Sequence, residues 1–450
     1  MSRYARCLSL LVVAAGLILF WTGTSSAIPA FSREHNTECT TCHTIYPELN
    51  EYGEAFLKNG FVWTKNKKVE PEVKAVAPKA EVKGEGDPDL LDKLKESAMV
   101  PNGQEAAAAE PSRKSEPLWL AGLPEKLPLS LAATLNYAYN DHPQDGDKFD
   151  FSTRAISLLA GGVIRDKVAF FVKYNLYTQG NFNPAVSNVP GNNDPDVEEA
   201  YFMWRKALNT PLNLKVGRFR PTLSLWKKTN KTSISDFLTT SYRVPDSQFT
   251  TDSTEDAIEV NAVLLNRLFV AGGIVDRDGQ NTKEGYGHIS YKFGGSDFNG
   301  KEPEVDLEHE SFTDYLSVTT GIYGYSGRNS NSTASSQRNN FYRTGADMDI
   351  LYKSLRLRLA GALGRDLNPD FASHTKLITT VFAAQAEYMF EVNTLGLFRY
   401  EHLDSEGIAN NYIASVAYAP IENTKITLEY QHGEGAQISN QTLLGLRFAF

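Results

Sequence analysis

The chain has 450 residues, a formal net charge of -9 and only three cysteines. An acidic chain of this kind has no evident reason to bind nucleic acid. The sequence also contains no hydrolytic constellation, no glycine-rich phosphate-binding loop and no zinc-ligand pattern.

The first 27 residues have the pattern of an export signal. Arg3 and Arg6 precede an apolar run over residues 8–20, and small residues follow up to Ala27. The run is too short to favour a membrane-spanning helix. Residues 1–27 are therefore predicted to be a signal peptide, and the mature protein is predicted to lie outside the cytoplasm.

The most specific motif follows directly, as Cys39-Thr40-Thr41-Cys42-His43. This spacing is that of a c-type haem attachment site, in which two thiols bind the porphyrin covalently and the adjacent imidazole binds the iron. A dithiol redox pair is the alternative, but such pairs sit near a strand-helix-strand pattern that is absent here. We therefore expect one covalent haem c on Cys39 and Cys42, with His43 as the axial iron ligand.

Residues 28–63 are predicted to form a small α-helical haem head. Apolar side chains recur at helix-like spacing from Tyr46 to Phe56, and the pattern closes at Gly60 and Phe61. So short a segment needs a cofactor or a partner in order to fold.

The second iron ligand stays open in the sequence. His35 is one candidate, with solvent exposure as the competing interpretation, and Met99 is a weaker candidate. A residue contributed by the barrel lumen, or water, is a further alternative for that position.

Residues 64–117 are rich in Lys, Glu, Pro and Ala and are predicted to be a flexible linker. A coil of this length spans about 40 Å. Its length leaves open whether the head is a tight plug or a swinging domain.

The region 118–450 alternates apolar and polar side chains in short segments, as in Val168–Tyr177. This alternation predicts an all-β fold, a 16-stranded antiparallel transmembrane β-barrel. A soluble sandwich is the alternative. The expected strands are 128–140, 150–163, 166–177, 197–206, 212–219, 255–264, 267–275, 284–294, 312–325, 340–352, 355–364, 378–390, 394–403, 411–420, 425–433 and 441–450.

Short connections alternate with long ones, which favours the membrane barrel, whose short turns face the periplasm. The predicted short turns are at Arg165-Asp166, Leu208-Asn209, Leu265-Asn266, Lys353-Ser354, Val392-Asn393 and Glu422-Asn423. A count of 16 strands fits this alternation only if residues 220–254 form one long insertion on the outer side, between the fifth and the sixth strand. The acidic stretch 295–311 breaks the rule, so either two strands are missed there or a partner docks.

Basic residues in the insertion are candidates for pairing with haem propionates or for attracting anions, although a solvated loop is the preferred interpretation. They are Lys227, Lys228, Lys231 and Arg243. The histidines outside the head are predicted to be single surface or lumen residues. They are His142, His288, His309, His374, His402 and His432.

The head resembles the N-terminus of the fused monohaem cytochrome-porin proteins of bacterial outer membranes, whose best-known members are iron oxidases. The resemblance rests on residues 28–33, the motif 39–43 and the positions Pro47, Gly53 and Gly60-Phe61. The stretch from Val216 to Arg243 also looks like the strand and inward-folding loop of phosphate-selective porins.

This resemblance implies an outer-membrane electron-transfer protein that passes electrons through one haem. Its expected partners are an extracellular donor or acceptor such as ferrous iron, a periplasmic c-type cytochrome and outer-membrane lipid, and ferrous iron oxidase activity follows as a candidate. Two competing functions stay open. One is a diffusion porin, anion-selective or not, with a haem-bearing plug or redox gate, and the second is a soluble periplasmic electron carrier.

Overall fold

The computed structural model describes the N-terminal head and most of the β region. The described residues are 30–35, 37–62, 129–141, 148–178, 195–242, 244, 250–277, 283–303, 305, 308–330, 337–372, 375–390, 393–435 and 438–449. The predicted signal peptide and linker, together with Met99, His142, Arg243 and His374, lie outside them. The chain divides into two compact units, Lys65–Leu123 and the remainder, and every described residue belongs to the second of these.

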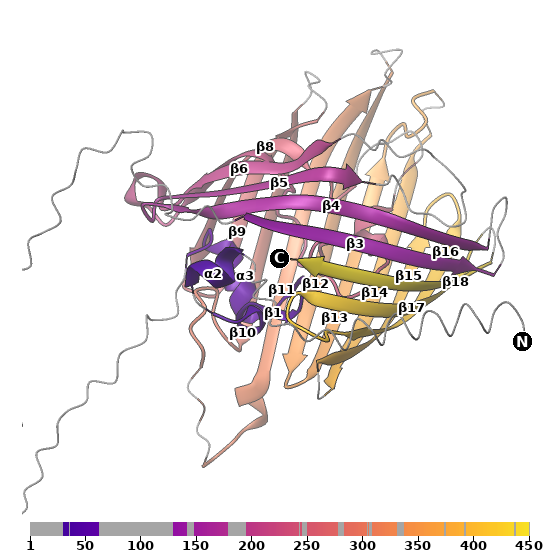
Figure 1. The fold of residues 1–450 in the computed structure, drawn as a ribbon. Coiled ribbons are helices and arrows are strands. Elements are labelled where there is room, and N and C mark those ends of the chain that lie inside the picture. Colours follow the sequence, from indigo (N-terminus) through magenta and orange to yellow (C-terminus); the bar gives the residue numbers. More distant parts are fainter. Residues whose placement is uncertain are drawn as a thin grey trace, which may run out of the picture. The chain divides into compact units, whose positions relative to one another are not determined.

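Sixteen antiparallel strands form one closed barrel, as the alternation predicted (Figure 1). The last strand pairs with the first, so the sheet has no free edge. The strands are β3 (Leu129–Asn140), β4 (Phe149–Ile164), β5 (Val168–Thr178), β6 (Asp196–Trp204), β7 (Asn213–Phe219), β8 (Glu255–Leu264), β9 (Leu268–Asp276), β10 (Lys283–Gly294), β11 (Leu316–Ser330), β12 (Arg338–Tyr352), β13 (Leu355–Asp366), β14 (Leu377–Phe390), β15 (Thr394–Asp404), β16 (Ile408–Tyr418), β17 (Thr424–Glu434) and β18 (Ser439–Ala449).

The predicted short turns lie together at one end of the barrel, which we call the short-turn end. In three of them both central residues have positive φ: Arg165-Asp166, Leu208-Asn209 and Leu265-Asn266. That backbone twist matches the right-handed twist of the strands that each turn joins. The opposite end is called the long-loop end.

The outer surface of the barrel is apolar. Most strands alternate between inward and outward positions, as β10 does. The exposed outward residues include Ile258, Ile274, Ile322, Leu363, Phe382, Phe398 and Leu428. Aromatic side chains lie exposed near both ends, with Phe293, Tyr388 and Phe390 at the short-turn end and Phe149, Tyr342 and Tyr430 at the other. An apolar band between two aromatic girdles is typical of a barrel that spans the outer membrane.

The inner surface is polar and densely charged. Buried residues there include Glu259, Arg343, Asp347, Arg358, Arg399, Glu401, Lys425 and Glu429. The insertion 220–254, found between β7 and β8 as predicted, folds onto this surface. Its amides at Ile234 and Ser235 donate to Glu429, and its short helix α5 (Leu238–Ser241) begins where the Leu238 amide donates to Glu401 at 2.8 Å.

The N-terminal head contains α2 (Ala30–His35), a 3-10 turn η1 (Cys39–Thr41), a two-stranded sheet of β1 (His43–Ile45) and β2 (Glu48–Leu49), and α3 (Glu51–Lys58). The helix predicted from the apolar spacing therefore began too early, because Tyr46 and Leu49 precede α3. Asn50 caps α3 by accepting from the Gly53 amide at 2.9 Å, which fixes the start of the helix. The chain leaves the helix through Gly60 and Phe61, both at positive φ, as the sequence indicated.

No helix among the described residues is long and apolar enough to cross a membrane.

Candidate functional site

The motif 39–43 forms a compact turn that α3 holds in place. The Cys42 amide donates to the Cys39 carbonyl at 3.1 Å, and the Asn50 side chain donates to the carbonyls of Thr40 and Thr41 at 3.0 and 3.1 Å. The helix approaches so closely that a Cβ at Gly53 would lie 2.1 Å from the Cys42 carbonyl oxygen. Glycine is therefore the residue that lets α3 pack on this turn.

His43 is oriented as an iron-binding imidazole would be. Its Nδ1 lies 3.3 Å from the Glu48 carbonyl oxygen, which leaves Nε2 as the nitrogen that can bind a metal. Burial lowers the pKa of His43 to about 4, and the nearby Arg447 charge acts in the same direction. The ring is therefore neutral near pH 7, as a ligand must be.

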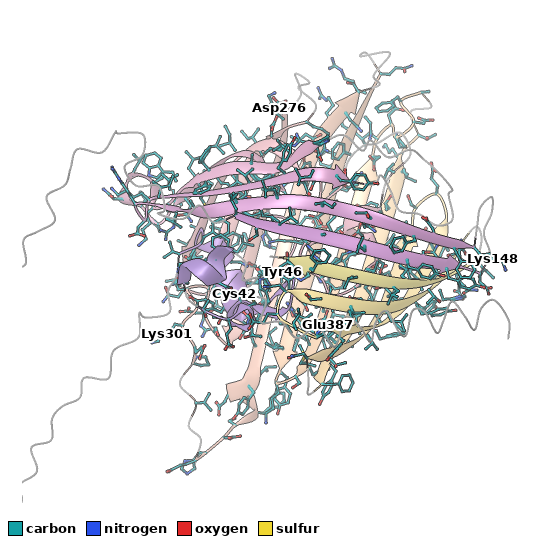
Figure 2. The ribbon with its side chains drawn as sticks, viewed as in Figure 1. Cys42, Tyr46, Lys148, Asp276, Lys301 and Glu387 are labelled. Atoms are coloured by element: carbon teal, nitrogen blue, oxygen red, sulfur yellow. The ribbon has the colours of Figure 1, made fainter. Side chains whose placement is uncertain are left out.

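Neither cysteine of the motif forms a disulfide. Cys39 is buried, with its Sγ 3.5 Å from the Ser32 hydroxyl, and burial raises the pKa of this thiol. Two thiols on one turn beside a neutral, oriented imidazole match the donor set that a covalent haem c requires. Figure 2 labels Cys42 and Tyr46 in this part of the head.

A cavity of about 570 Å³ lies beside His43, within the usual size range of ligand sites, about 300–1,000 Å³. The head contributes seven residues to its lining, among them His43, Tyr46 and Leu49, and barrel and insertion side chains complete it. Neither thiol lines this cavity, and neither does His35, whose ring packs edge-on against Phe56 at 5.8 Å. The structure thus does not bring the candidate distal ligand to the His43 cavity.

The cavity lining is rich in cations, and several are paired. Arg220 contacts Glu198 and Glu199, and Lys231 contacts Asp236. Lys227, Lys228, Lys425 and Arg447 also line it, and the Arg447 guanidinium lies 5.3 Å from the centre of the Tyr46 ring. The solvated-loop interpretation is wrong for Lys231, which is only 7% exposed. It failed because the insertion folds into the lumen.

The head is bound to the inner wall through Glu48. This side chain is fully buried and accepts from Arg356 at 3.0 Å, from Arg358 at 2.6 Å and from the Thr232 hydroxyl at 2.7 Å. Two arginines of β13 and one residue of the insertion therefore meet on a single carboxylate of the head.

Helix α3 makes further polar contacts with the barrel and the insertion. Glu51 pairs with Lys292 of β10 at 2.7 Å. Asn230 of the insertion donates to Glu54 at 2.6 Å and accepts from the Leu49 amide at 2.7 Å. The head is therefore held at three points within the barrel mouth.

The connection 295–311 was expected either to contain two missed strands or to bind a partner, and its residue Phe298 contacts the head. The Asn59 side chain donates to the Phe298 carbonyl at 2.6 Å, and the Lys58 ammonium lies 5.0 Å from the centre of the Phe298 ring. The described residues of this connection form no strand. The described part of this connection therefore contacts the helix α3 and the residue that follows it.

Apolar packing completes the contact. Phe31, Phe56 and Phe61 of the head cluster together, and Phe61 lies 6.0 Å from Phe171 of β5. Ile45 packs with Leu395, Leu397 and Ile413. Phe171, Leu395 and Leu397 lie near the short-turn ends of their strands, so the head occupies that mouth of the barrel.

Sequence reasoning placed the haem motif but missed the residues that receive it. Arg356, Arg358 and Lys292 appear in the sequence only as polar positions of alternating strands. Nothing in a strand pattern marks which inward charge meets the head. Among the described residues no group of three or more His, Cys, Asp or Glu side chains is placed to hold a metal ion.

No family model matches this chain, and no curated protein matches it. The fused cytochrome-porin resemblance of the head therefore stays a prediction.

Among solved structures the barrel is similar to an anion-selective porin from Comamonas acidovorans, with 10% identity, a TM-score of 0.51, and coverage of 72% of this chain and 99% of the porin. OmpT of Vibrio cholerae gives 10% identity, a TM-score of 0.49 and coverage of 72% and 99%. The channel DcaP of Acinetobacter baumannii has 11% identity and a TM-score of 0.48, with coverage of 74% of this chain and 100% of the channel. The first likeness shows a shared fold. With its closed sheet and apolar outer band, the protein is an outer-membrane β-barrel of the porin fold.

Proposed function

We propose that this protein carries one haem c on Cys39 and Cys42, with His43 as an axial ligand, and moves electrons across the outer membrane. The donor would be an extracellular reductant such as ferrous iron, and the acceptor a periplasmic c-type cytochrome. When bound, a haem c supplies reversible one-electron chemistry. The observation that carries the proposal is the attachment turn, with its oriented and neutral His43, fixed inside the mouth of a membrane barrel.

The chain's own residues account for the rest of the design. The Glu48 carbonyl orients the His43 ring, and the Glu48 carboxylate ties the same segment to Arg356 and Arg358. Short turns of such barrels face the periplasm, so a head in that mouth is within reach of a periplasmic partner. The insertion and the head both occupy the lumen, which favours an electron conduit over an open pore.

The proposal is tested on protein purified in detergent from a host that attaches c-type haem. Mass spectrometry of the mature chain should show one added haem, and Cys42→Ser should weaken its retention. The oxidised protein is then mixed with ferrous iron while its visible absorption is followed. Reduction of the haem is expected. A chain without cofactor mass would overturn the haem assignment, and a haem that ferrous iron fails to reduce would overturn the donor.

A second candidate function is a diffusion porin with a haem-bearing plug. The fold favours it, because the structure with a TM-score of 0.51 is an anion-selective porin. Full-length protein in planar bilayers separates the two functions. Large, steady open-channel currents would support the porin, and a closed baseline would support the conduit.

A further inference from the structure

We infer that the inner wall of the barrel, on the long-loop side of the head, holds a binding site for a divalent transition-metal ion. His288 of β10 and Asp347 of β12 form this site. This inference deepens the proposed function, on which it rests, by locating where a ferrous ion would bind before it gives up its electron. Neither residue belongs to the haem motif, and no pattern in the sequence pairs them.

Both side chains are buried and incompletely bonded. His288 is 3% exposed and Asp347 is 5% exposed. Within the described part of the chain, neither ring nitrogen of His288 has a hydrogen-bond partner, and neither has the Oδ1 atom of Asp347. Burying such atoms without partners is unfavourable, because they lose their hydrogen bonds to water. A metal ion that accepts a lone pair from the His288 Nε2 and one from the Asp347 Oδ1 would remove that cost.

The two unpartnered atoms converge on one point. Gly321 of β11 pairs with Asp347 on one side and with Ser290, two residues from His288, on the other. A Cβ built on Gly321 would lie 2.4 Å from the Asp347 Oδ1 and 3.0 Å from the His288 Nε2. The glycine thus leaves a gap over which an imidazole nitrogen and a carboxylate oxygen meet.

The geometry suits a metal ion better than an organic ligand. Imidazole nitrogen and carboxylate oxygen bind such ions at about 2.0–2.2 Å. Asp347 is held in place by its other oxygen, which accepts from the Ser224 hydroxyl at 2.6 Å and from the Leu225 amide at 2.9 Å. Two protein ligands leave the remaining coordination positions to water, as suits a substrate ion that must also leave.

The position relative to the head fits the proposed role. His288 lines a cavity of about 130 Å³, which has room for several water molecules. That cavity and the one beside His43 share lining residues, among them Glu54, Leu57 and Lys227. The proposed ion site is therefore separated from the His43 cavity by one layer of side chains.

Three ammonium groups, of Lys58, Lys215 and Lys227, also line the smaller cavity. The positive charge of Lys58 is offset by its ion pair with Glu54 at 2.8 Å. Lys215 and Lys227 remain as charges that oppose cation binding. Removing Lys227, which lies in the insertion and not on a strand, should therefore strengthen the site.

The test is calorimetric titration of the detergent-purified holoprotein with Zn²⁺, a redox-inactive probe. We expect one Zn²⁺ per chain. His288→Ala and Gly321→Ala should each weaken binding by at least tenfold, the second by filling the gap, whereas Lys227→Met should strengthen it. His432→Ala, which alters a histidine near the long-loop end, is the control and should bind like the parent. Unchanged heat-modifiable gel migration verifies that each variant is folded.

Absence of Zn²⁺ binding, or equal binding by the parent and His288→Ala, would overturn the site. The same proteins mixed with ferrous iron keep the two proposals apart. Zn²⁺ binding without haem reduction would retain the metal site and reject the ferrous donor. Haem reduction at equal rates in the parent and in His288→Ala would retain the donor and reject the site.

Discussion

The contact of Glu48 with the barrel gives the sharpest prediction about how the head is held. In Glu48→Gln, the amide oxygen still accepts one hydrogen bond, but the charge that compensates Arg356 and Arg358 is lost. Neutralising one partner of a buried ion pair costs about 3–5 kcal/mol. Arg356 retains its contact with Asp349, so the lower end of that range, about 3 kcal/mol, applies. That energy weakens docking of the head by about two orders of magnitude.

Hydrogen exchange followed by mass spectrometry measures this directly, through the peptide that covers α3 (Glu51–Lys58). In Glu48→Gln the exchange of this peptide should accelerate by about a hundredfold, following the roughly 3 kcal/mol above, while barrel peptides remain as in the parent.

Glu38→Gln is the matched control, because Glu38 lies exposed in the same segment and exposed charges contribute at most about 1 kcal/mol. Equal protection of α3 in the parent and in Glu48→Gln would refute the view that this carboxylate anchors the head.

Three further predictions concern the head and its cavity. Gly53→Ala should reduce the haem content per chain, measured by absorption, because the new Cβ would lie 2.1 Å from the Cys42 carbonyl; Gly285→Ala, which meets nothing within 4 Å, is the control. Burial opposes ionisation of Glu54, but neighbouring ammonium groups outweigh it and lower its pKa below the usual 4.5. Its stabilising effect is therefore complete above pH 4.5 and is lost as the pH falls through the lower folded value, so a midpoint of α3 exchange protection above pH 4.5 would contradict this assignment. Arg447→Gln removes a positive charge from the His43 cavity and should lower the midpoint potential by up to about 59 mV, a tenfold change for one electron; an unchanged or raised potential in a spectroelectrochemical titration would count against it.

Much of the barrel is determined by local sequence. Side chains of a strand alternate between the two faces, so the expected strand 166–177 was found, within two residues, as Val168–Thr178 without knowledge of its neighbours. Turn positions are equally local, because Leu265-Asn266 needs only its own left-handed backbone. The 16 strands and the insertion 220–254 followed from these two signals. The turn at residues 39–43 is also local, since its chemistry lies within five residues.

The tertiary structure alone decided what fills the lumen. Glu48 meets Arg356 although 308 positions separate them, and Asn59 meets Phe298 across 239. The sequence showed Arg356 only as a strand residue and Phe298 only as part of a connection. The same holds for His288 and Asp347, which face one gap because Gly321 lies between them in the register. Strand periodicity fixes the face on which a side chain lies, whereas its partner depends on strand order, register and the path of the inserted chain.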